Sequence, residues 1–147
     1  MDKKLVIRRF IDEVVNTGDL EHLAEFVSAD CRESNDPTGQ AVGLDSMRAH
    51  VRGVRTTFPD LRITVEQQIA EGDWVATRVT ARATHVGWWL GIKPTGKAVA
   101  ITGVNLDRVV NGRIVEQGGA ANMFEALLSI GAIQAVGDTQ EGPSNKR

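Results

Sequence analysis

Two side chains in this chain have the chemistry and the setting to move a proton near neutral pH. His85 ends a predicted strand in the segment Thr-His-Val-Gly, and an imidazole titrates close to physiological pH. Asp107 shares one face of a later strand with Asn105, because side chains two residues apart point the same way. Each has a structural alternative, since His85 can order the loop that follows it and Asp107 can form an exposed pair with Arg108.

Other reactive groups show no pattern of their own. The three histidines, at positions 22, 50 and 85, and the single cysteine lack the spacing of metal ligands. Cys31 has no partner within the chain for a disulfide and is expected to be a small buried hydrophobe. The sequence has no glycine-rich phosphate loop with a lysine and no serine triad signature. We therefore expect neither a metal nor a cofactor.

Composition and charge narrow the class of partner. The net charge is −2 and the basic residues are scattered singly, so no basic stripe is available for nucleic acid. No apolar run approaches the roughly 18 residues that a membrane span needs, and the N-terminus lacks the hydrophobic region of a signal peptide. We expect one cytoplasmic domain over residues 1–133 and a loose polar tail over 134–147.

The first half of the chain has the hydrophobic period of helices. Apolar residues at helical spacing predict a first helix over residues 2–16, then a second, and then a third that stops at Pro59. Residues 31–43 lie between the second and third helices and are predicted to be irregular, with a short strand at their start. The expected N-caps of the three helices are Asp2, Asp19 and Asp45.

The second half alternates with a period of two, which is typical of strands with one buried face. The Glu-Gly-Asp turn at 71–73 and the Asn111-Gly112 dipeptide predict two antiparallel hairpins, the second from a residue pair that tolerates positive φ. The result is a four-stranded meander with helices on one face, which is an α+β domain. A short helix follows, with Asn122 and Glu125 as its capping box and Gly131 at its end.

Several short motifs recur in a fixed order between Phe10 and Ile133. They are Phe-Pro-Asp, Glu-Gly-Asp, Thr-His-Val-Gly, the loop Gly-Ile-Lys-Pro-Thr-Gly-Lys and the final Asn-Gly-Arg-Ile-Val-Glu. In this order they resemble the SnoaL-like polyketide cyclases, a branch of the NTF2-like cone fold. The resemblance implies helices packed on a curved antiparallel sheet, a pocket for a hydrophobic, polyketide-like molecule, and a homodimer formed through the sheet.

The resemblance also exposes a difference in chemistry. The positions that line the cavity in this family match Asn105, Gln117, Gly119 and Asn122, so amides or glycine replace the family's histidine and aspartate. Amides do not titrate, although they can donate hydrogen bonds to a developing enolate. We therefore expect the usual carboxylate base to be absent. Changing Gln117 to His and Gly119 to Asp together is expected to rebuild it and to give weak cyclase activity.

The candidate site follows from the motifs and the resemblance together. The resemblance places Asp36 at the cavity mouth, although an Asx-Pro pair is also a turn former. The candidate catalytic residues are therefore His85, Asp36 and Asp107. The residues expected to bind substrate are Asn35, Arg78, Trp89, Asn105, Gln117 and Asn122.

Some of these residues have two interpretations. Arg78 is either a pocket guanidinium or an outward residue of the sheet, and Asn122 either lines the pocket or only caps the last helix. Trp88 and Trp89 either clamp a flat ligand or plug the open end of the cone. The outer, dimer-forming face of the sheet is expected to carry four small or β-branched residues, Val75, Thr77, Val79 and Ala81.

Three functions fit these observations. The first is a cofactor-independent polyketide-tailoring enzyme, cyclase-like or isomerase-like, acting on a polycyclic or ester-bearing intermediate. The second is the hydroxylase offshoot of the same family, with a partner reductase, which the missing carboxylate favours. The third is a non-catalytic binding protein, because a fold alone does not establish activity.

Overall fold

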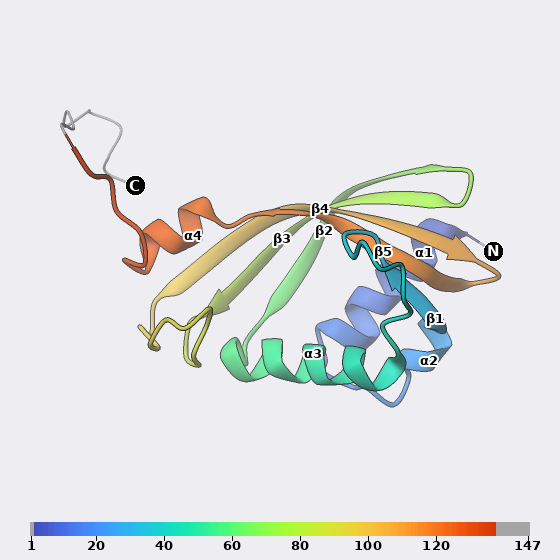
Figure 1. Ribbon diagram of the computed structural model, residues 1–147, viewed down its shortest axis with the longest axis horizontal. Helices are drawn as coiled ribbons and strands as arrows, with labels where there is room; N and C mark the ends of the chain where they lie inside the picture. Colours follow the sequence, from blue (N-terminus) through green and yellow to red (C-terminus); the bar gives the residue numbers. More distant parts are fainter. Residues whose placement is uncertain (1, 138–147) are drawn as a thin grey trace.

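This computed structural model describes residues 2–137. These residues form a five-stranded sheet with helices packed on one face (Figure 1). Its strand order is β1-β5-β4-β3-β2. The strands are β1 (Val27–Glu33), β2 (Arg62–Glu71), β3 (Trp74–Thr84), β4 (Ala98–Val110) and β5 (Arg113–Asn122). The helices are α1 (Lys3–Phe10), the π-helix η1 (Ile11–Val15), α2 (Leu23–Phe26), α3 (Leu44–Thr57) and α4 (Phe124–Ser129).

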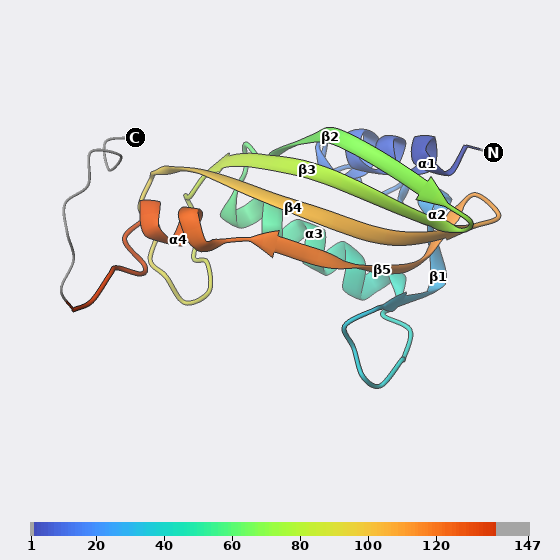
Figure 2. The same cartoon turned by 90° about the horizontal axis from the view of Figure 1, so that it is seen from above.

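Strands β2 to β5 form the predicted antiparallel meander. The β2–β3 hairpin turns at Gly72, and the β4–β5 hairpin turns at Asn111 and Gly112, which have φ of 51° and 77°. Both turn residues at positive φ are what the Asn-Gly dipeptide predicts, so this hairpin is confirmed. β4 is the longest strand, and the long axis of the sheet follows it (Figure 2).

The prediction of a four-stranded sheet is wrong by one strand. β1 pairs with β5 in parallel, with Glu33 opposite Gln117, and so adds a fifth strand at the edge. The pairing is long-range, and the hydrophobic pattern of residues 27–33 does not show which strand accepts them. Figure 1 shows β1 beside β5, with α2 leading directly into it.

The N-terminal helix docks on the sheet through its own end. Asp2 caps α1 by accepting hydrogen bonds from the backbone N–H of Lys4 and Leu5, as predicted. After η1, the Asn16 side chain donates to the Ile63 carbonyl at 3.0 Å and accepts from the Ile63 N–H at 2.7 Å. This reciprocal pair uses the free backbone edge of β2 and fixes the helix across the inner face of the sheet.

The other two predicted helices differ from expectation at their ends. Only Leu23–Phe26 of the second is helical, because the β-branched Val27 begins β1 in extended conformation. Asp19 instead accepts a hydrogen bond from the Glu21 N–H in the preceding turn. The N-cap of α3 is Gly43 rather than Asp45, which lies in the first turn and pairs with Arg48.

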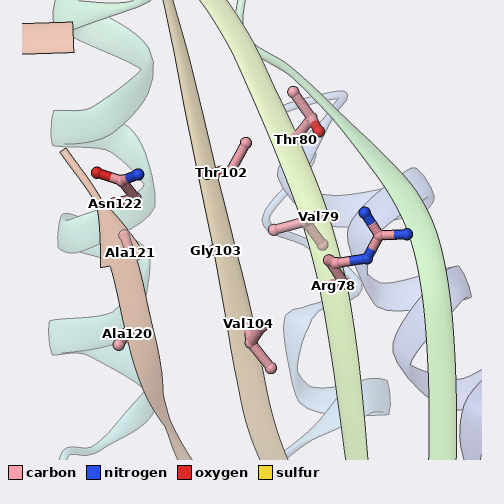
Figure 3. Close-up of a pocket in the computed structure, with 9 residues that line it drawn as sticks. All are labelled: Arg78, Val79, Thr80, Thr102, Gly103, Val104, Ala120, Ala121 and Asn122. Carbon is pink, nitrogen blue, oxygen red and sulfur yellow. The ribbon is translucent and has the colours of Figure 1, made fainter. Parts of the chain in front are cut away.

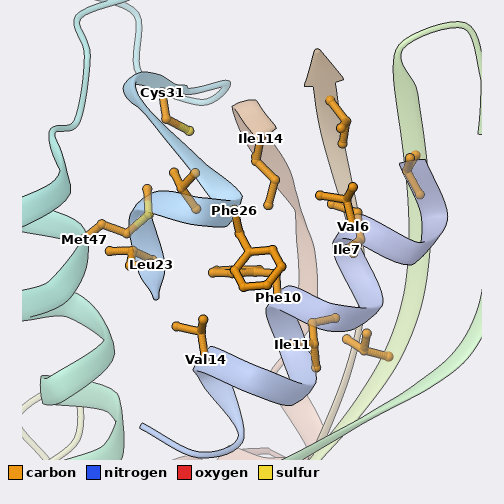
Figure 4. Close-up of a cluster of buried hydrophobic side chains, with 14 residues drawn as sticks. Val6, Ile7, Phe10, Ile11, Val14, Leu23, Phe26, Cys31, Met47 and Ile114 are labelled. Carbon is orange, nitrogen blue, oxygen red and sulfur yellow. The ribbon is translucent and has the colours of Figure 1, made fainter. Parts of the chain in front are cut away.

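Two hydrophobic clusters hold the layers together. The larger lies between α1, η1 and α2 and the inner face of the sheet (Figure 4). The smaller lies at the far end of the sheet, around Phe58, Leu61, Val99 and Ala126. The odd-numbered side chains of β3 point to the inner, helix-covered face of the sheet. The four residues expected on the outer face therefore lie on the inner face instead: Val75, Thr77, Val79 and Ala81.

The last helix closes the described chain. Asn122 accepts a hydrogen bond from the Phe124 N–H at the start of α4, and Gly131 follows its end with φ of 77°. The expected domain over residues 1–133 covers all the elements above, and most of the expected tail, residues 138–147, lies outside the described residues. Within residues 2–137, no helix has the length and apolar character needed to cross a membrane.

Candidate functional site

A cavity of about 210 Å³ lies between the N-terminal helices and the inner face of β4 and β5. Its apolar wall comes from Ile7, Phe10 and Ile11, which also belong to the larger hydrophobic cluster. Its polar wall comes from the sheet and consists of Glu33, Asn105, Asp107, Gln117 and Gly118. One wall is therefore dry and the other carries carboxyl and amide groups, which is the arrangement of a small-molecule site.

The polar wall is a row across three neighbouring strands. Gln117 on β5 is the register partner of Glu33 on β1 and of Asp107 on β4, so the three residues lie abreast. Directly opposite residues share a face of the sheet, and Asn105 follows two positions from Asp107 on that face. The sheet register thus brings two carboxyl groups and two amides into one cavity.

Asp107 is the buried acid of this row. Its residue is 5% exposed, and no hydrogen bond or ion pair is made by its carboxyl group within the described part of the chain. Burial, together with the nearby charge of Glu33, raises the pKa of Asp107 from 3.8 to about 7. A carboxyl group with this pKa takes up and releases protons at neutral pH, as a general base must.

His85 directly follows β3, at the end of the β3–β4 pair opposite to the end that holds Asp107. Its backbone N–H bonds to the carbonyl of Lys97, and the stretch of β4 from there to Asp107 spans on the order of 30 Å at the usual rise of a strand. The ring is fully buried between Phe58 and Trp89, with Nδ1 3.0 Å from the hydroxyl of Thr95. His85 and Asp107 therefore cannot contact the same reacting atoms.

Trp89 belongs to the His85 end of the molecule. Its ring meets Phe58 edge to face, with the centroids 5.2 Å apart, and it is half-buried in the smaller cluster. Trp88 points outward and is 66% exposed. This geometry matches a hydrophobic plug at the end of the sheet more closely than a clamp around the cavity.

Asn35 and Asp36 lie in the loop between β1 and α3. Asp36 accepts hydrogen bonds from both the backbone N–H and the hydroxyl of Thr38, each at 2.9 Å, and so closes a turn. Asn35 is exposed, and neither residue lines the 210 Å³ cavity. The loop projects away from the sheet in the view of Figure 2.

Arg78 and Asn122 lie on the outer face of the sheet, away from the helices (Figure 3). They border a shallow hollow of about 530 Å³ together with Thr80, Thr102 and Val104. The hollow is larger than the inner cavity, but none of the described residues that line it is a buried titratable group. Of the residues expected to bind substrate, the structure brings only Asn105 and Gln117 to Asp107.

A family model for the SnoaL-like polyketide cyclases matches residues 5–129. The chain belongs to this family. An aklanonic acid methyl ester cyclase of Streptomyces galilaeus is 26% identical over 116 residues, which cover 78% of this chain and 81% of the relative. A cyclase of the same description from Streptomyces peucetius is 26% identical over 112 residues, covering 74% and 77%.

Solved structures of other proteins have the same fold. A candidate hydroxylase from Streptomyces galilaeus superposes with a TM-score of 0.78 at 30% identity, covering 92% of this chain and 88% of that protein. A candidate polyketide cyclase from Streptomyces antibioticus gives 0.76 at 30% identity, covering 89% and 99%. The fold is therefore the α+β cone of the NTF2-like proteins.

The structure argues against the expectation that an aspartate at Gly119 would rebuild the carboxylate base of the family. Gly119 has φ of 130°, a conformation that other residues rarely adopt, and a Cβ there would collide with the carbonyl oxygen of Val104 and lie 2.8 Å from the Cα of Asn105. Aspartate cannot be added without moving β4 and β5 apart. The pair of changes at Gln117 and Gly119 is therefore not a usable way to install a base.

Glu33 is the pocket residue that the sequence did not reveal. It lies at the start of residues 31–43, where the sequence predicted a short strand without a pairing partner, and the parallel pairing of β1 with β5 brings it to the cavity. The parity of β4 did place Asp107 beside Asn105, so a signal for the buried acid was present. No cluster of three or more His, Cys, Asp or Glu suited to a metal ion occurs within residues 2–137.

Proposed function

We propose that this protein is a cofactor-independent polyketide-tailoring enzyme that closes a ring by an aldol-type reaction, with Asp107 as the base. The observation that carries the proposal is a buried carboxyl group that has no hydrogen-bond or ion-pair partner among residues 2–137 and faces a cavity walled by amides and apolar side chains. The resemblance of the motifs matches Gly119 to the family's usual carboxylate position, and in this proposal Asp107 supplies a carboxylate from the neighbouring strand instead.

The reaction needs one group that takes a proton and later returns it. The Asp107 carboxylate removes a proton from the carbon next to a substrate carbonyl, and the electron pair of that C–H bond moves to the enolate. Asn105 and Gln117 donate amide hydrogen bonds to the enolate oxygen as its charge develops. The enolate carbon bonds to a second carbonyl carbon, and the resulting alkoxide recovers the proton from Asp107.

The cavity favours a flat, mostly apolar substrate that carries a few oxygens. Its 210 Å³ is smaller than a typical drug-sized pocket, so it receives the reacting ring while the remainder of the molecule lies outside. Gly119 and Ala121 continue the inner face of β5 and are exposed, which leaves room for that remainder. Esters of aromatic polyketides are the substrate class that the names of the two curated relatives suggest.

We also expect the protein to act as a homodimer. The outer face of the sheet is exposed and carries the apolar side chains of Ile69, Val104 and Leu106, which are 62%, 46% and 45% exposed. A second copy that covers this face would remove them from water. The inner cavity lies on the opposite side, so each copy keeps its own site.

A second candidate is hydroxylation of a polycyclic substrate with the help of a partner reductase. It is favoured by the 30% identity to the candidate hydroxylase, which extends over 92% of this chain. In that reaction Asp107 would deprotonate the substrate bound in the pocket. The substrate anion would then react with molecular oxygen, and the partner reductase would supply the electrons. The two candidates differ in the mass of the product.

The test is product analysis after incubation with an aromatic polyketide methyl ester. We expect a cyclised product of unchanged mass that forms without oxygen or reductant, and we expect Asp107→Asn to abolish it. Asp36→Asn is the matched control, since Asp36 lies outside the cavity, and should turn over normally. A product one oxygen heavier, formed only with a reductase, would favour the hydroxylase, and binding without turnover would leave a binding protein.

A further inference from the structure

Glu33 and Asp107 stand on either side of Gln117 in the same cavity. Two interstrand spacings separate their Cα atoms, which is about 10 Å across the sheet. Both side chains line the cavity, and neither carboxyl group has a hydrogen bond or ion pair within residues 2–137. Two acids therefore share one small space without a counter-ion.

Within residues 2–137, no cation is among the groups that shift the pKa of Asp107. On β3 its register partner is Val75, and on α1 and η1 the facing side chains are apolar. The titratable neighbours on β1 are Glu33 and Cys31, and burial, followed by the charges of Asp107 and nearby glutamates, raises the pKa of the Cys31 thiol to about 11, so it stays neutral. Glu33 is consequently the charge that Asp107 experiences most directly from within the cavity.

We propose that Glu33 is a positioning residue of the reaction, whose carboxylate, held across Gln117 from Asp107, makes Asp107 a stronger base. A negative charge nearby disfavours the ionised form of a second carboxyl group, so the proton that Asp107 accepts is held more tightly. The catalytic consequence rests on the proposed role of Asp107. The electrostatic coupling of the two residues does not.

The register of the sheet explains why Glu33 suits this role. Its backbone is held by the pairing of β1 with β5, and the next residue, Ser34, donates its N–H to the Gln117 carbonyl at 2.7 Å. Gln117 lies between the two acids, so they cannot meet directly and Asp107 remains open to substrate. The carboxylate of Glu33 thus acts through space and leaves the reacting atoms to Asp107.

The experiment is a carbon-13 NMR titration of the Asp107 carboxyl group in the wild type and in three variants. Glu33→Gln should move the midpoint of Asp107 to lower pH by about one unit, the size expected for two charges about 10 Å apart at an effective dielectric constant near 20. Glu33→Asp keeps the charge and should retain most of the wild-type midpoint. Glu116→Gln is the matched control, because Glu116 is the register neighbour of Arg108 and does not line the cavity.

The kinetic counterpart is the pH profile of ring closure. In Glu33→Gln the acid limb should move to lower pH with Asp107, and the plateau rate should fall because a weaker base abstracts the proton more slowly. An unmoved Asp107 midpoint in Glu33→Gln, or an equal shift in Glu116→Gln, would overturn the proposal. If no polyketide ester is turned over at all, the proposed function fails, while a shifted midpoint still supports the coupling of Glu33 to Asp107.

Discussion

Burial of the Asp107 carboxyl group lowers the stability of the folded protein above neutral pH and makes the group a base at neutral pH. Its pKa is raised to about 7 in the folded protein, mainly by burial, whereas an unfolded aspartate has a pKa near 3.9. Between these values the folded state holds a proton that the unfolded state has lost, so the free energy of unfolding falls as pH rises through this range. Above pH 7 the folded protein carries a buried carboxylate that it stabilises poorly, as expected of a functional group.

The first prediction is therefore that Asp107→Asn stabilises the protein at pH 8. The gap between 3.8 and about 7 corresponds to at most about 4 kcal/mol in the free energy of unfolding, and the gain should vanish near pH 4. Urea denaturation across pH 4–8 measures it, with Asp36→Asn as the control, because Asp36 is half-buried in the loop after β1 and lies outside the cavity. Equal stability of wild type and Asp107→Asn at pH 8 would mean that the carboxyl group is not desolvated.

Gly119 sets the spacing of two strands at the element scale. Because it has no Cβ, the backbone of β5 can approach the Val104 carbonyl and Asn105 of β4. That approach holds Gln117 and Asn105 in position on the cavity wall. The close contact between β5 and β4 requires a glycine at this position. The presence of Gly119 therefore has a structural reason in addition to any loss of a catalytic carboxylate.

We predict that Gly119→Ala destabilises the protein by more than about 2 kcal/mol, because both the backbone conformation and the contact with β4 oppose a side chain. Gly39→Ala is the control. Gly39 also has positive φ, at 64°, but a Cβ there meets nothing within 4 Å, so only a backbone cost of about 1 kcal/mol is expected. Thermal unfolding of both variants gives the comparison, and similar losses would show that the strand contact is unimportant.

The elements differ in how far the sequence could predict them. The alternation of β4 and the Asn111-Gly112 turn depend on neighbours in the chain, so the hairpin and the shared face of Asn105 and Asp107 were predictable. The sequence predicted a short strand at the start of residues 31–43, but its pairing with β5 joins residues that are far apart in sequence, so the place of this strand and of Glu33 in the sheet was not predictable. The separation of His85 from Asp107 was not predictable either, because it depends on the length of β4 and on its register with β3.

The outer face of the sheet is the main feature at the scale of the whole molecule. The residues on this face of β3 and β4 include Ala76, Thr80, Ala100, Thr102 and Val104, which are small or β-branched. Small and β-branched side chains let such a surface approach a copy of itself related by twofold symmetry. The dimer stays a proposal, now based on the opposite set of residues from those named by the sequence pattern.

We predict that Val104→Lys with Leu106→Lys converts the dimer into a monomer, because two buried charges would face each other across the interface. Leu5→Lys is the control, since Leu5 is 50% exposed on α1, away from the sheet. Light scattering should give twice the 15.9 kDa of the chain for wild type and control. A wild type that stays at 15.9 kDa at high concentration would remove the dimer and leave the cavity unaffected.

The role of Asp107 as the base is tested most directly by hydrogen exchange at the substrate carbon. A β-keto ester analogue that cannot close a ring is incubated in deuterated buffer, and uptake of deuterium next to its carbonyl is followed by NMR. We predict uptake by the wild type that rises through a midpoint near pH 7, unchanged uptake by His85→Asn, and only the buffer rate with Asp107→Asn. Exchange by Asp107→Asn at the wild-type rate, or its loss in His85→Asn alone, would contradict the account.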